Sequence, residues 1–277
     1  MRDARSLGDR LLDPVNAAVA SSCLLFLWLP VAVLLVFSFS GARQPHVWGG
    51  FSTRWYADLL QNADVRRTAG NSFFVAVCVA ALATVLGTSL ALGLDRRART
   101  RSTAGHDVAV MVPILVPDVV QGISLLLAFT TAFAACDRLF GAAPTLGRGT
   151  IVLAHTAFTT SYVAILVRTR LATIPRNLEE AALDLGATPA QAFRRVTLPL
   201  LAPAVLGGAL LAFTLSLDEY VLTFFNSGAG SDTLPVWIAS AVRRAQVTPV
   251  VNAVSALMVV LSVALVSASV VLQRRRT

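Results

Sequence analysis

The chain has 277 residues, of which 56% are apolar and only 14% charged, with a formal net charge of +8. A soluble domain carries about 25% charged residues, so this deficit favours a protein whose solvent is lipid. All 23 cationic residues are arginine. Because Walker-type phosphate loops and Schiff-base enzymes need a lysine, the sequence excludes both kinds of chemistry.

Apolar runs long enough to cross a membrane occur six times, since about 20 such residues span the hydrocarbon core. The sequence therefore predicts an all-α, polytopic membrane protein in which residues 1–277 form a single transmembrane domain. The first run is too long for the hydrophobic region of a cleaved signal peptide, so we expect it to be retained. The predicted spans are 17–39, 71–94, 107–134, 150–167, 200–224 and 250–272.

Arginine is unevenly shared between the two sides of such a bundle. Six spans place both termini on one side, and the segments on that side carry 15 of the 23 arginines. They are the two tails and the loops 95–106 and 168–198. Since cytoplasmic segments are enriched in arginine and lysine, both termini are expected in the cytoplasm. The basic charge thus indicates topology and is not the footprint of a nucleic-acid-binding surface.

The first outer segment, 40–70, contains Trp55 and Tyr56 directly after a Ser-Thr-Arg run. One interpretation is a short interfacial helix anchored by these rings. The other is that Trp55 belongs to a gate or binding surface.

The third span carries an acidic residue, Asp118, directly after Pro117. Counting the helical rise from the cytoplasmic end places Asp118 near the midplane of the bilayer. A charged side chain at that depth costs about 2.5–3.5 kcal/mol on insertion scales, so we expect it to have a counterion or a function.

The cytoplasmic loop 168–198 contains two signals for short helices. Asn177, followed three residues later by Glu180, predicts a capped helix that ends at Gly186, where glycine can adopt the left-handed conformation. Thr188, with Pro189 at the first helical position, predicts a second capped helix. Two capped helices with a small apolar face favour a compact knob that docks on a partner, and the alternative is a plain connector.

The same loop resembles the EAA-x3-G-x9-I-x-LP signature of ABC importer permeases, with Val196 in place of the usual isoleucine. The resemblance implies the type I importer permease fold, with this loop as the coupling helix seated in a cleft of an ATP-binding subunit. It also implies that the partner ATPase binds ATP and magnesium, and that this chain needs no cofactor. The motif residues assigned to coupling are Glu180, Ala181, Ala182, Gly186, Leu198 and Pro199.

The fifth span carries two further acids, Asp218 and Glu219, in its outer half. No arginine lies within the predicted spans, and His155 is the only candidate cation there. The counterion is then a cationic solute or a second subunit, unless water or protonation replaces it. A run of acids suits a linear diamine or polyamine, whose ammonium groups donate strongly to carboxylates.

Aromatic side chains near these acids either add cation–π attraction or simply pack at the interface. They are Trp55, Tyr220, Phe224 and Phe225. Cysteines and histidines, by contrast, are scattered without ligand spacing, so no metal site is expected. No nucleophile–base set is visible either, so we do not expect an enzyme.

From about residue 15 to 272, the chain resembles the permease subunits of putrescine and spermidine importers. The matching stretches are Phe51–Tyr56, Pro117-Asp118, Glu180–Gly186, Ala212–Glu219, Leu234-Pro235 and Pro249–Ala253. Glu219 stands where the family usually has aspartate, which keeps the charge and lengthens its reach. The resemblance implies that polyamine passage involves Trp55, Asp118, Ser216, Asp218 and Glu219.

The resemblance further implies a bacterial inner-membrane transporter that works by alternating access. Its expected partners are a periplasmic binding protein that delivers the polyamine, a second permease subunit and two ATP-binding subunits. One alternative is an ABC permease for another solute, such as an amino-acid derivative, thiamine or iron; the acidic pair at 218–219 would repel anionic solutes. Another is a secondary carrier without an ATPase, which would have no need of the capped loop.

Overall fold

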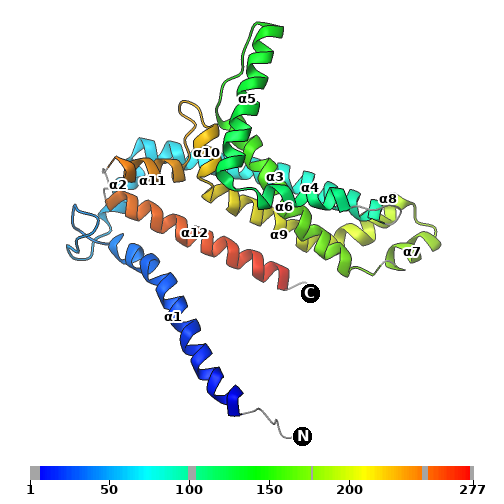
Figure 1. The fold of residues 1–277 in the computed structure, drawn as a ribbon, viewed down its shortest axis with the longest axis horizontal. Coiled ribbons are helices and arrows are strands. Elements are labelled where there is room, and N and C mark those ends of the chain that lie inside the picture. Colours follow the sequence, from blue (N-terminus) through cyan, green and yellow to red (C-terminus); the bar gives the residue numbers. More distant parts are fainter. Residues whose placement is uncertain (1–6, 99–103, 176, 245–248, 275–277) are drawn as a thin grey trace. The chain divides into compact units, whose positions relative to one another are not determined.

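The computed structural model describes residues 7–98, 104–175, 177–244 and 249–274, and helices dominate them (Figure 1). Among these described residues, six helices are long and apolar enough to cross a membrane. The predicted all-α fold with six membrane helices is therefore confirmed. The helices are α1 (Leu7–Phe37), α2 (Arg54–Gln61), α3 (Ala63–Ala98), α4 (Ala104–Leu115), α5 (Asp118–Phe140), α6 (Arg148–Thr173), α7 (Asn177–Asp184), α8 (Pro189–Ala192), the π-helix η1 (Phe193–Thr197), α9 (Leu198–Asp218), α10 (Val221–Asn226), α11 (Leu234–Arg243) and α12 (Pro249–Arg274).

The third predicted span, 107–134, is not one helix but is divided between α4 and α5. Proline disfavours helical conformation in the residue before it, and the helix stops ahead of Pro117, whose ψ of 136° is extended. Asp118 therefore lies in the first turn of α5 instead of inside a continuous span. The fifth predicted span, 200–224, also ends early: α9 stops at Asp218. Four of the six arginines of the two tails and part of the 95–106 loop lie outside the described residues.

The described residues form two compact units, one within 1–62 and 241–258 and the other within 63–240 and 259–277. In the first unit, the segment after α1 folds around Trp55, which is 7% exposed. The Trp55 indole N–H donates to the Ser40 carbonyl at 2.7 Å, and the Arg54 guanidinium lies 4.2 Å from the ring centroid. These contacts hold the short helix α2 against the turn that precedes it, so the Trp55 ring packs within the protein. The interfacial position of this helix stays a prediction.

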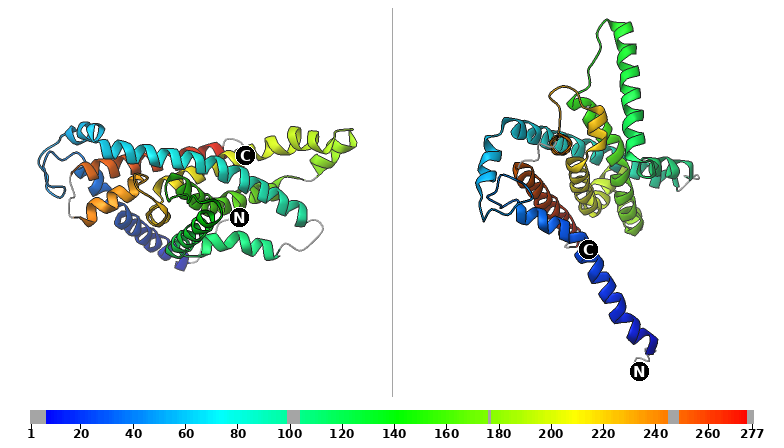
Figure 2. Two further views of the ribbon diagram at one scale, coloured as in Figure 1. Left: turned by 90° about the horizontal axis from the view of Figure 1, so that it is seen from above. Right: turned by 60° about the vertical axis from the view of Figure 1, so that its left-hand side comes forward.

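In the second unit, α3, α6 and α9 pack side by side to form the core (Figures 1 and 2). Val163 of α6 is fully buried between two glycines. A Cβ on Gly87 of α3 would lie 2.7 Å from the Val163 Cβ, and one on Gly208 of α9 would lie 3.1 Å from its Cγ1. Membrane helices lack a hydrophobic driving force toward each other, so such close approach of backbones supplies the packing energy.

Helix α5 belongs to the same unit but projects away from this core over much of its length (Figure 2). Only 6% of the most apolar stretch of this helix is buried inside the structure. Leu127, Leu139 and Phe140 are largely exposed. Its first turns pack against α10, where Gly122 approaches the Phe225 ring so closely that a Cβ would lie 2.7 Å from it. The start of α5, with Asp118, is thereby held beside α10.

Candidate functional site

Asp218 and Glu219 lie at a break between two helices. Asp218 ends α9, Glu219 is extended with ψ 116°, and α10 begins at Val221. The Glu219 Oε1 atom accepts the Leu222 backbone N–H at 3.0 Å. Its carboxylate therefore satisfies one of the amide groups that the first turn of a helix leaves unpaired. Glu219 is thus partly engaged within the protein.

Asp218 remains exposed, and it has a hydroxyl partner in α12. The Ser262 hydroxyl lies 2.9 Å from Oδ2 and 3.2 Å from Oδ1 of Asp218. Because serine has a single proton to donate, it is shared between the two oxygens, and most acceptor positions of the carboxylate stay available. A ligand with several N–H donors can still be bound there.

Asp118 joins the pair from α5. It is exposed, and its charge interacts with that of Glu219. Helix α10 brings the two elements together, since the Asn226 side-chain amide donates to the Gly122 carbonyl of α5 at 3.3 Å. We call Asp118, Asp218 and Glu219 the carboxylate site. Within the described residues, no arginine forms an ion pair with any of the three.

The structure gives the two other predicted pathway residues different surroundings. Ser216 is 4% exposed, and its hydroxyl lies 2.9 Å from the His155 Nδ1 atom. Trp55 is buried within the first unit against Ser40. Neither contact involves a carboxylate. His155 contacts hydroxyl groups on both ring nitrogens, so it is not the missing counterion of the acids.

Three of the four aromatic residues named from the sequence, Tyr220, Phe224 and Phe225, lie on α10 or directly before it. The Tyr220 and Phe224 centroids are 5.7 Å apart, and those of Phe224 and Phe225 are 5.3 Å apart. Phe225 packs against Gly122 of α5, whereas Phe224 is 41% exposed. Among the three, Phe224 is therefore the ring with the most surface left for a ligand.

Sequence reasoning missed two polar residues that complete this region, Ser262 and Thr223. Ser262 contacts Asp218 from 44 positions away, and Thr223 contacts His155 from 68 positions away. Their only signal in the sequence is a hydroxyl in an otherwise apolar run. Serine and threonine satisfy their own helix backbone so often that this signal has little weight.

The loop after α6 forms a knob, residues 177–197, made of α7, α8 and η1. The second cap is confirmed: Gln191 N–H bonds the Thr188 hydroxyl at 3.3 Å, and Thr188 N–H bonds the Gln191 side chain at 3.0 Å. Gly186 has the predicted left-handed backbone with φ +85°. Asn177, however, lies inside the first turn of α7, and residue 176, where a cap would then stand, is outside the described residues.

The end of α7 satisfies its carbonyls in the pattern of a Schellman motif. Gly186 N–H donates to Leu183 O at 2.9 Å, and Ala187 N–H donates to Ala182 O at 3.0 Å. No residue of α7 is buried. Leu185 is 89% exposed, next to the exposed Glu180 and Ala181. The knob thus carries an apolar surface that the described residues of this chain leave uncovered.

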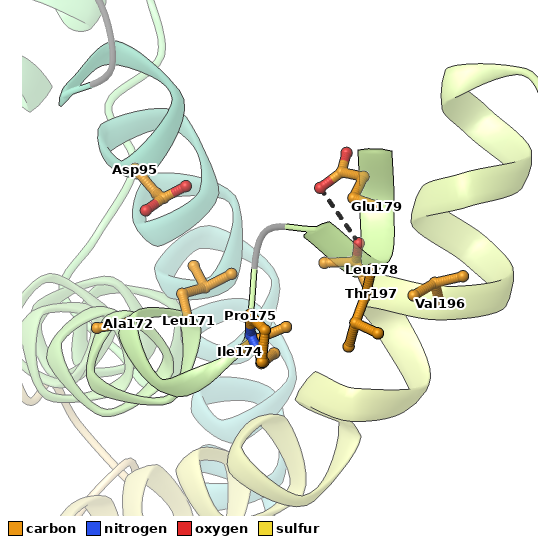
Figure 3. Close-up of a pocket in the computed structure, with 9 residues that line it drawn as sticks. All are labelled: Asp95, Leu171, Ala172, Ile174, Pro175, Leu178, Glu179, Val196 and Thr197. Atoms are coloured by element: carbon orange, nitrogen blue, oxygen red, sulfur yellow. Dashed lines mark hydrogen bonds between the residues drawn. The ribbon is translucent and has the colours of Figure 1, made fainter. Parts of the chain in front are cut away.

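A cavity of about 260 Å³ separates the knob from the end of the helix bundle (Figure 3). The Thr197 hydroxyl reaches toward Glu179 Oε2 across one side of it, at 3.5 Å. The lining residues are Asp95, Leu171, Ala172, Ile174, Pro175, Leu178, Glu179, Val196 and Thr197. Because of this cavity the contact between the knob and the bundle is incompletely packed, whereas the knob continues directly into α9.

The family model and the similar proteins found by comparison agree with one another. Residues 83–277 match the family described as "Binding-protein-dependent transport system inner membrane component". The chain is 43% identical over 232 residues to the putrescine transport system permease protein PotI of Escherichia coli, covering 84% of this chain and 81% of PotI. It is 36% identical over 250 residues to the spermidine/putrescine transport system permease protein PotC of Haemophilus influenzae, covering 90% and 93%.

Solved structures show the same fold at low sequence identity. A chain of a bacterial ABC transporter involved in the import of the acidic polysaccharide alginate superposes with a TM-score of 0.74 at 16% identity, covering 96% of each chain. A chain of the MetNI methionine ABC transporter superposes with a TM-score of 0.57 at 19% identity, covering 76% of this chain and 95% of that one. These likenesses concern the fold alone.

Proposed function

We propose that this chain, which belongs to the family of binding-protein-dependent transport system inner membrane components, is the permease subunit that carries a polyamine such as putrescine or spermidine. The observation that carries this proposal is the carboxylate site. Asp218 and Glu219 adjoin at the α9–α10 break, Asp118 at the start of α5 is close enough for its charge to act on Glu219, and no arginine is paired to any of the three in the described residues. The names of the relatives PotI and PotC point to the same class of solute.

A linear polyamine supplies what this site lacks. Its ammonium groups are spaced along a flexible apolar chain, so one molecule can donate to two carboxylates at once. Asp118 and Asp218 are exposed and have acceptor positions free for such donors. Glu219 is held by the Leu222 N–H, which limits how tightly it binds a cation, and a transport site must also release its solute.

The fold by itself does not choose the solute. A structural neighbour with the same fold belongs to a transporter of an acidic polysaccharide, whereas three carboxylates at a site would repel such an anion. Function in a shared fold depends on the side chains of the site. The acidic site therefore favours a cation over the anionic solutes carried by some relatives of the fold.

Energy for transport would enter through the knob. Its exposed leucines and the exposed Glu180 and Gly186 suit a contact with an ATP-binding subunit, which would hold the ATP and magnesium. Differential contact of the knob with two arrangements of a pair of such subunits would drive alternating access. Completion of the transporter would require a second permease subunit and a periplasmic binding protein. The arginine distribution favours cytoplasmic termini in this multi-pass inner membrane protein.

Transport by reconstituted proteoliposomes tests the proposal. The chain is assembled with its partner subunits, and ATP-dependent uptake of radiolabelled putrescine and spermidine is measured. The double variant Asp218→Asn/Glu219→Gln should reduce uptake at least tenfold, because two charge-assisted hydrogen bonds are weakened together. Asp137→Asn, which removes an exposed acid at the far end of α5, is the matched control and should retain uptake within about twofold.

Two results would contradict the proposal. If the double variant took up putrescine at the rate of the unaltered protein, at equal protein level, the carboxylate site would not recognise the amine. If no ATP-binding subunit copurified with the chain in mild detergent, and uptake were indifferent to ATP, a secondary carrier would be the better description.

A further inference from the structure

The break between α9 and α10 decides where the Asp218 and Glu219 carboxylates point. Local contacts across it join Glu219 to the Leu222 N–H and to the Thr223 hydroxyl. Glu219 and Tyr220 alone join the two helices, and neither is a glycine or proline. Helix α10 has only six residues, which is too short to be stable without outside contacts. Something beyond the local backbone must therefore hold the angle between the helices.

His155 of α6 bridges the break. Its Nδ1 atom lies 2.9 Å from the Ser216 hydroxyl of α9, and its Nε2 atom lies 2.9 Å from the Thr223 hydroxyl of α10. His155 and Thr223 are fully buried, and Ser216 is 4% exposed. One imidazole ring thus contacts both helices, on the side of the break that faces the core.

The hydrogen bonds around the ring have a single consistent direction. The Thr223 hydroxyl donates its one proton to the Glu219 carbonyl, at 3.2 Å, so its oxygen must accept from the His155 Nε2–H. A neutral imidazole with its proton on Nε2 accepts at Nδ1, and the Ser216 hydroxyl supplies that donor. The chain of bonds runs from Ser216 through His155 and Thr223 to the backbone of Glu219. Both ring nitrogens are used, so none is left for a solute or a metal.

We infer that His155 is a positioning residue: through Ser216 and Thr223 it fixes the α9–α10 angle, and with it the directions of the two carboxylates that bind the amine. This inference rests on the proposed polyamine function for its consequence in transport, but the bridging geometry itself does not. Hydrogen bonds in a buried network are worth more than isolated ones, and losing one leaves a buried donor unpaired. Removing one hydrogen bond of the bridge is therefore costly enough to change the geometry of the carboxylate site.

Thr223 is the residue through which to test this bridge. Thr223→Val keeps the shape of the side chain but removes the hydroxyl, and Thr223→Ser keeps the hydroxyl. The matched control is Thr159→Val, because Thr159 is also fully buried and donates to the backbone carbonyl of His155, at 2.8 Å, whereas the ring nitrogens bond Ser216 and Thr223. Each variant is measured for putrescine uptake in the reconstituted complex, as KM and maximal rate separately.

We expect Thr223→Val to raise KM about fivefold, the effect of one lost hydrogen bond, with the maximal rate within about twofold. Thr223→Ser and Thr159→Val should keep the KM of the unaltered protein. If Thr223→Val lowered only the maximal rate, if serine failed to restore KM, or if Thr159→Val raised KM equally, the residue would be merely structural and the inference would be wrong.

A second measurement separates this inference from the proposed function. Spin labels are placed at Leu206 of α9 and Phe224 of α10, both substantially exposed, in a variant whose three native cysteines are replaced. In the assembled complex, Thr223→Val should broaden the distribution of label distances, and Thr223→Ser should not. An unchanged distribution overturns the bridge even if polyamine is transported. A broadened one supports it even if the unaltered protein takes up no polyamine, a result that would refute the proposed function alone.

Discussion

Helix α9 connects two regions that are built in different ways. At its N-terminal end, the knob is fixed by contacts between residues a few positions apart, such as Thr188 with Gln191 and Gly186 with Leu183. At its C-terminal end, the carboxylate site depends on α5, α6 and α12, with Asp218 and Ser262 separated by 44 positions. The knob can therefore keep its local form when the bundle rearranges, whereas the carboxylate site changes with every helix that moves.

This difference predicts separate consequences for substitutions at the two ends. Changes in the knob should alter the rate at which ATP drives transport and leave the affinity for solute intact. Changes at the carboxylate site should alter affinity first. A substitution in the core that both regions share should lower the transport rate and the affinity for solute together. It serves as the reference for substitutions in the knob and at the carboxylate site.

The largest expected effect comes from that shared core. Gly87→Leu would place a large side chain where even a single added Cβ would lie 2.7 Å from the Val163 Cβ. Overpacking of this kind costs about 1–3 kcal/mol, and the helices would have to separate to relieve it. We expect lower yield in membranes, a lower Tm in detergent and equal losses of uptake and ATPase activity. Gly93→Leu, on the same helix at a position with open space around it, is the control.

A smaller and more selective effect is expected in the knob. Gly186→Ala puts a Cβ on a backbone with φ +85°, which costs about 1–2 kcal/mol and disturbs the end of α7. Uptake should fall about tenfold in maximal rate with KM for the amine unchanged. Gly141→Ala imposes the same strain at the end of α5, where φ is +68°, and should have less than a twofold effect. Equal losses in both variants would contradict a special role for the knob.

The smallest expected effect is at Ser262. Ser262→Ala removes the hydroxyl that orients the Asp218 carboxylate but leaves its charge. Loss of one solvent-exposed hydrogen bond to the carboxylate should raise the KM for putrescine about twofold to threefold, without a change in maximal rate or in Tm. Ser262→Thr restores the hydroxyl and should restore KM. A fall in maximal rate alone would indicate that the two ends of α9 are not as separable as their construction suggests.

The same contrast explains how much could be predicted from the sequence. The second helix start and the helix end of the knob were predictable because capping residues act over three or four positions. The break at Pro117 followed a known preference of proline, but the hydropathy of 107–134 ran through it without interruption. The break after Asp218 contains no glycine or proline, so the sequence does not predict it.

The partners of the acids were beyond the reach of sequence patterns. Nothing in the spacing of Ser262, His155 and Asn226 indicates that they meet α9, α10 and α5, because these contacts depend on how distant helices pack. The notable absence of arginine from the spans could be read directly. It identified the acids as unpaired, but it did not identify the hydroxyl and amide groups that orient them.

Because α9 is long, a small movement at the knob produces a large displacement at the opposite end of the helix. Its 21 residues make a rod of about 31 Å, since each residue of an α-helix advances about 1.5 Å. Tilting such a rod by about 10° about its lower end displaces the upper end by about 5 Å, well beyond the few tenths of an ångström that a hydrogen bond tolerates. As a lever arm, α9 needs only a slight rocking of the helices packed on it to make or break every polar contact of Asp218.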